Sequence, residues 1–65
     1  MNNKQKFNDV AHSTSGMTTT QRAGAFSYLT GALRILLETD TVDAAKIVSA
    51  YNDAKNYGIK SYPKN

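Results

Sequence analysis

The segment from Thr18 to Glu38 limits the possible folds of this 65-residue chain more than any other part. Thr18 is followed three residues later by Gln21. This is the spacing of a capping box, in which the two side chains bond the backbone N–H groups at the start of a helix. Apolar residues then recur every three or four positions, which is the period of an α-helix. The sequence therefore predicts a first long helix over residues 18–38.

This helix is apolar on two opposite sides. One side carries the expected core residues Phe26, Leu29, Leu33 and Leu36. The other side carries a stripe with small members, formed by Gly24, Tyr28, Gly31 and Ile35. Each glycine inside a helix costs about 1 kcal/mol relative to alanine, and glycines on one face let another backbone approach closely. We therefore expect this helix to be buried on both sides.

A second helix is predicted over residues 41–57. Asp40 or Thr41 is the expected N-cap, and Asp43 falls in the first turn, where the helix dipole favours a carboxylate. Gly58 is expected to end the helix in the left-handed conformation. The apolar face of this helix supplies the remaining expected core residues, Ile47, Val48, Tyr51 and Ala54. The linker between the two predicted helices has only two or three residues. Because so short a linker makes successive helices antiparallel neighbours, we expect an all-α helical hairpin.

The segments on either side of the hairpin are polar. Within residues 1–16, the spacing of Phe7, Val10 and Ala11 predicts one short helix from about residue 3 to residue 11, with a frayed arm as the alternative. We assign residues 17–59 to the hairpin and expect residues 60–65 to form a flexible tail.

The second helix can cover only one side of the first. The Phe7 segment or a second copy of the chain must then cover the other side. The sequence has no cysteine and a single histidine, so disulfides and a Cys/His metal site are excluded. Small domains without such cross-links commonly rely on oligomerisation. We expect a homodimer, or a higher helical bundle, with its interface at Gly24, Tyr28, Gly31 and Ile35.

The sequence offers no arrangement of catalytic groups. His12, the one imidazole, lies in the polar N-terminal segment without a placed acid. We therefore expect neither an enzyme nor a cofactor or metal site. The remaining hypothesis is a binding module that acts stoichiometrically, either inhibiting or adapting a protein partner or sequestering a small anionic ligand such as a nucleotide.

The start of the first helix is the candidate anion site. Helix N-termini favour anions, and hydroxyl groups and a guanidinium are available there. The residues concerned are Thr18, Thr19, Thr20 and Arg22. Helix capping, with Arg22 extended to water, is the alternative interpretation.

A competing hypothesis is a small basic nucleic-acid-binding protein, because the C-terminal segment mixes lysines, which attract phosphate, with tyrosines, which offer stacking faces. Its candidate contacts are Lys55, Lys60, Tyr62 and Lys64. Neither the helix-turn-helix nor the ribbon-helix-helix pattern is present. The longest apolar region, residues 25–37, is shorter than the roughly 20 residues that span a bilayer. No apolar run follows the N-terminal lysines, so we expect a cytoplasmic protein without a signal peptide.

Overall fold

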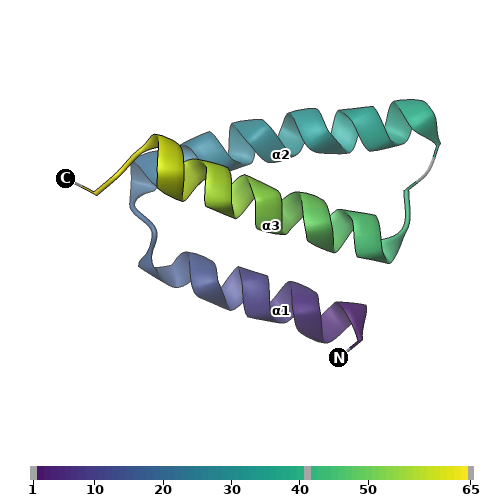
Figure 1. Ribbon diagram of the computed structural model, residues 1–65, viewed down its shortest axis with the longest axis horizontal. Coiled ribbons are helices and arrows are strands. Elements are labelled where there is room, and N and C mark those ends of the chain that lie inside the picture. The colour runs from purple at the N-terminus through teal and green to yellow at the C-terminus, as the bar shows by residue number, and fades with distance from the viewer. Residues whose placement is uncertain (1, 41, 65) are drawn as a thin grey trace.

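The computed structural model describes residues 2–40 and 42–64. In this part of the chain, the elements are α1 (Asn3–Ser13), the 3-10 helix η1 (Thr14–Gly16), α2 (Thr19–Thr39) and α3 (Ala44–Ser61), with no strand. α2 and α3 lie side by side and run antiparallel, and α1 lies along the other side of α3 (Figure 1). The prediction of an all-α chain with two long, closely packed helices is confirmed. Of the two forms considered for the N-terminal segment, the short helix is the one observed.

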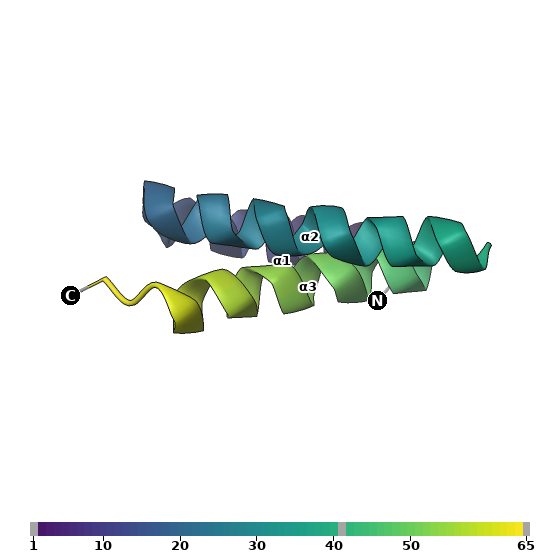
Figure 2. The same ribbon diagram turned by 90° about the horizontal axis from the view of Figure 1, so that it is seen from above.

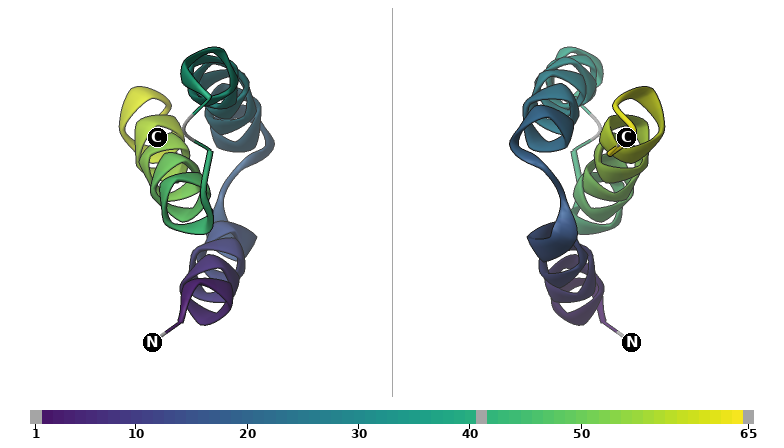
Figure 3. Two further views of the ribbon diagram at one scale, coloured as in Figure 1. Left: turned by 90° about the vertical axis from the view of Figure 1, so that its right-hand side faces the viewer. Right: turned by 90° about the vertical axis from the view of Figure 1, so that its left-hand side faces the viewer.

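The three helices form an open arrangement. α2 and α3 remain neighbours along their length when seen from above (Figure 2). Seen end-on, α1 lies below this pair and packs mainly on α3 (Figure 3). The side of α2 that is turned away from α3 therefore has little cover from the rest of the chain.

The start of α2 is fixed by the predicted capping box, which is confirmed. The Thr18 backbone N–H donates to Oε1 of Gln21 at 2.9 Å, and the Gln21 backbone N–H donates to the Thr18 hydroxyl at 3.1 Å. Gln21 is 2% exposed, and Met17 beside it is also buried. Because the Gln21 amide is bonded locally, its burial leaves no unsatisfied polar group there.

The turn between the long helices differs from the prediction. Asp40 does not cap α3; it ends α2 in the left-handed conformation, with φ 55°, and its backbone N–H bonds the Leu36 and Leu37 carbonyls. Asp43 is the N-cap of α3, and its carboxylate accepts from the Lys46 backbone N–H at 2.9 Å. Aspartate suits both positions, so local sequence does not distinguish them. The alternative cap, Thr41, lies outside the described residues.

The prediction that Gly58 ends the second helix is wrong. No described glycine has a positive φ, and α3 continues through Gly58 to Ser61. The reason is packing, because Gly58 is buried against Gln21 and Ala25 of α2. Gly58 continues a seam of small buried residues on α3 that also contains Ala50 and Ala54. This seam allows the two helix backbones to approach closely.

The core is small and differs from the predicted one. Its buried members are Met17, Gln21, Gly24, Ala50, Ala54 and Gly58. Among the expected core residues, Ala54 is 1% exposed, whereas Phe26 is 71% and Ile47 36% exposed. The others are half-buried, namely Leu29, Leu33, Leu36, Val48 and Tyr51. Phe26 is exposed because α2 presents the side of Gln21 and Ala25 to α3, which rotates the phenyl ring outward.

The accessible surface of the single chain is large for its size. It measures 4,639 Å², whereas a folded monomer of 7.1 kDa exposes roughly 4,100 Å². Much of the exposed apolar surface lies on α2, where Phe26 and Leu37 are each 71% exposed and Ile35 is 62% exposed. A single copy thus leaves apolar surface available for a further partner.

A ring contact helps to hold α1 on α3. The rings of Phe7 and Tyr51 lie 5.0 Å apart, centroid to centroid, and no residue of α1 is buried. Because an isolated helix of this length is marginal in water, Phe7→Ala is expected to release α1 while α2 and α3 stay paired. Amide hydrogen exchange should show protection lost over residues 5–13 alone. Asn8→Ala, an exposed change on the same helix, is the control. Unchanged protection in Phe7→Ala would show that other contacts hold α1.

Candidate functional site

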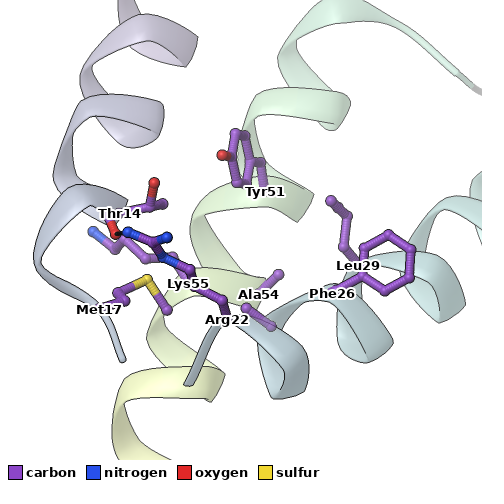
Figure 4. A pocket seen from close by; sticks show the side chains of 9 residues that line it. Thr14, Met17, Arg22, Phe26, Leu29, Tyr51, Ala54 and Lys55 are labelled. Carbon is purple, nitrogen blue, oxygen red and sulfur yellow. Dashed lines mark hydrogen bonds between the residues drawn. The ribbon is translucent and has the colours of Figure 1, made fainter. Parts of the chain in front are cut away.

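A groove of about 470 Å³ lies between α2, α3 and the α1–η1 corner (Figure 4). Its size is within the range of ~300–1,000 Å³ that is usual for small-molecule sites. All three helical segments contribute lining residues, so the groove exists only when the hairpin and the N-terminal segment are packed together. The lining residues are Thr14, Met17, Arg22, Ala25, Phe26, Leu29, Tyr51, Ala54 and Lys55.

The Arg22 side chain is held at one end of this groove. Its Nη2 donates to the carbonyl oxygens of Thr14 at 3.2 Å and Ser15 at 3.3 Å. These carbonyls belong to the 3-10 turn that follows α1, so Arg22 connects the start of α2 to that turn. A guanidinium has five N–H donors, and both contacts use the same nitrogen. The Nε and Nη1 donors therefore remain available to a ligand.

Lys55 adds a second positive charge at the same end. Its half-buried side chain comes from α3, and Figure 4 shows it together with Arg22 near Thr14. None of the described residues that line the groove is acidic. The one ion pair within residues 2–40 and 42–64 lies elsewhere, between Arg34 Nε and Glu38 Oε1 at 3.2 Å. The i,i+4 spacing of the two residues accounts for this pair, whereas Arg22 and Lys55 have no carboxylate partner among the described residues.

The other end of the groove is apolar. Phe26 and Leu29 of α2 lie there, with Tyr51 of α3 on the opposite wall (Figure 4). Phe26 is 71% exposed, so its ring is accessible. The groove therefore combines two cationic groups at one end with aromatic and aliphatic surface at the other.

The structure separates the residues of the predicted anion site. The hydroxyl of Thr18 is engaged in the capping box. Thr19 and Thr20 are exposed, and Thr20 borders a different depression, on the side of Gly24. Of the predicted set, Arg22 alone lines the groove. Lys55 was missed as its neighbour; it lies four residues after Tyr51, and therefore on the same face of α3.

The stripe predicted as a subunit interface is divided by the fold. The Tyr62 ring lies directly against Gly24, and the Tyr28 and Tyr57 rings are 5.1 Å apart. Gly24 is thus buried by the chain itself, whereas Tyr28 touches Tyr57 but stays 41% exposed. Gly31 has open space around it, and Ile35 is 62% exposed.

The C-terminal residues proposed for nucleic-acid contact are also dispersed. Lys55 lies in the groove, whereas Tyr62 packs on Gly24. Gly24 and Arg22 are two positions apart on α2, so they lie on different sides of that helix. Lys60 is exposed, and Lys64 borders a separate hollow next to Pro63. Lys55 and Lys64 thus border different hollows.

Across residues 2–40 and 42–64, no three side chains of the types that bind metals lie close together. No helix in the same ranges has the length and apolar character needed to cross a membrane. Comparison of the chain with protein-family models, with curated proteins and with solved structures finds no match.

Proposed function

We propose that the chain is a non-enzymatic helical binding module that works as a homodimer and takes up its partner stoichiometrically. The observation that carries this proposal is a strip of exposed and half-exposed side chains along the outer face of α2. Its members are Phe26, Thr30, Leu33 and Leu37. We call these residues the α2 strip.

The spacing of the α2 strip suits pairing with a copy of itself. Its members are separated by four, three and four positions, a pattern that reads the same in both directions along the helix. A twofold axis at its midpoint places Phe26 opposite Leu37 of the second copy, and Thr30 opposite Leu33. Two antiparallel α2 helices can therefore bury each other's apolar residues in one symmetric contact.

The surface area also favours a second copy. One chain exposes roughly 500 Å² more than expected for a folded monomer of its mass. A standard interface covers about 800 Å² on each partner, which the α2 strip and the helix surface around it can supply. The small core supports the same conclusion, because a domain of this size gains little stability from its core alone and association is one way to add to it.

The proposed function predicts that stability depends on protein concentration, because association stabilises the folded state by mass action. Thermal unfolding followed by circular dichroism should give a midpoint that rises between low micromolar and submillimolar chain concentration. A midpoint that stays constant over this range would contradict the homodimer.

The nucleic-acid hypothesis is less well supported, because Lys55 and Lys64 border different hollows and Tyr62 packs on Gly24. It nevertheless makes a distinct prediction. Binding to a single-stranded oligonucleotide should weaken steeply as salt rises. A gel-shift assay at two salt concentrations, with and without residues 59–65, tests it directly.

A further inference from the structure

We infer that the groove between α2, α3 and η1 binds a small organic anion that carries an aromatic ring, the chemistry of a free nucleotide. This inference deepens the proposed function by naming the ligand. It does not require dimerisation, because one chain supplies every described residue of the groove. Phe26 belongs both to the groove and to the α2 strip, so a ligand and a second copy compete for its ring.

The cationic end specifies the charge of the ligand. Arg22 and Lys55 lie together near Thr14 (Figure 4), and no acidic residue lines the groove beside them. Their positive charges are therefore not neutralised within the groove. Arg22 is also oriented, since its Nη2 is bonded to two backbone carbonyl groups. An oriented guanidinium beside an ammonium is a recognised arrangement for a phosphate group.

The apolar end specifies the rest of the ligand. In the single chain Phe26 presents an accessible ring, and Leu29 and Tyr51 extend the same apolar surface. Every nucleobase has a flat face that can stack on aromatic side chains, whichever base it is. Inorganic phosphate alone would satisfy the two cations but leave this surface uncovered. A nucleotide covers both ends of the groove, whose volume of about 470 Å³ suits a small molecule.

Calorimetric titration of the full chain with adenosine monophosphate tests this inference. Adenosine and inorganic phosphate are the companion probes, and each should bind at least tenfold more weakly than the nucleotide because each satisfies only one end. Binding of the nucleotide no tighter than phosphate would overturn the aromatic part of the inference. Absence of nucleotide binding up to millimolar concentration would overturn all of it.

Two variants locate the site. Lys55→Gln and Arg22→Gln should each weaken nucleotide binding at least tenfold, because each removes a charge from the cationic end. Arg34→Gln is the matched control: it removes one positive charge from the same helix, at a side chain that is 80% exposed and far from the groove. Equal weakening in all three variants would show a nonspecific charge effect and overturn the site.

Further measurements distinguish effects on folding, on ring stacking and on dimerisation from effects on phosphate binding. Circular dichroism of Arg22→Gln checks the fold, and Lys55→Gln tests the site without touching the Arg22 contacts to η1. Phe26→Leu should weaken binding of the nucleotide but not of inorganic phosphate. If the chain binds a single-stranded oligonucleotide more tightly than the mononucleotide, the inference that its ligand is a free nucleotide is wrong. Dimerisation, measured separately by sedimentation, can fail while nucleotide binding persists.

Discussion

Gly58→Ala should destabilise the chain by about 2–3 kcal/mol, although alanine is the better helix former. The added methyl group would overlap the carbonyl oxygen of Gln21 and lie 3.1 Å from Cβ of Ala25 and 3.2 Å from its backbone nitrogen. Backbone atoms of α2 cannot move aside as the end of a flexible side chain can, so α2 and α3 must separate. A domain of this size has only about 3–5 kcal/mol in total, so the variant should keep only about 0–3 kcal/mol.

The other helical glycines provide controls for this result. Gly31 has no atom within 4 Å of an added Cβ, so Gly31→Ala should stabilise the chain by about 1 kcal/mol. At Gly24 the obstacle is the Tyr62 ring, a side chain that can turn away, so Gly24→Ala should cost less than Gly58→Ala. Urea unfolding of the three variants measures this order. A Gly58→Ala variant as stable as the original chain would contradict the close approach of α2 and α3.

Leu37→Lys should weaken self-association about a thousandfold. A twofold contact buries the Leu37 side chain from each copy, and burial of a leucine is worth about 1.5–3 kcal/mol. Two such losses amount to about 4 kcal/mol, which corresponds to roughly a thousandfold in the dissociation constant. The fold of the single chain should be unaffected, because Leu37 is 71% exposed within it.

Ile35→Lys is the matched control for this variant. Ile35 lies on the same helix, is also large and apolar, and is 62% exposed. Its position two residues before Leu37 puts it on a different side of α2, outside the α2 strip. Analytical ultracentrifugation should find Ile35→Lys associating as the original chain does. If Ile35→Lys dissociates instead, the interface lies on the side of Gly31 and Ile35, as the sequence alone predicted.

The parts of the fold that depend on local chemistry could be predicted from the sequence. The capping box of Thr18 and Gln21 is such a feature, because both partners lie within one helical turn. The spacing of Phe7, Val10 and Ala11 likewise indicated a helix that the structure contains. Local signals predicted that these segments are helical and where α2 begins, but not where α3 begins and ends.

The features that depend on how the helices are rotated against each other could not be predicted. The local sequence around Gly58 resembles a helix terminator. Glycine is needed there for another reason, because a side chain at this position would collide with α2. Phe26 belongs to a regular apolar face of α2, but the side of α2 that contacts α3 is the side of Gln21 and Ala25. The position of Arg22 and Lys55 in one groove could not be predicted either, because it arises only when α2 and α3 pack together.

Association of the chain through α2 is the central claim, and sedimentation equilibrium of the full chain at physiological salt tests it most directly. The predicted result is a mass that approaches twice the 7.1 kDa of one chain as concentration rises into the micromolar range. A well-folded chain that keeps the mass of a single copy up to submillimolar concentration would contradict it.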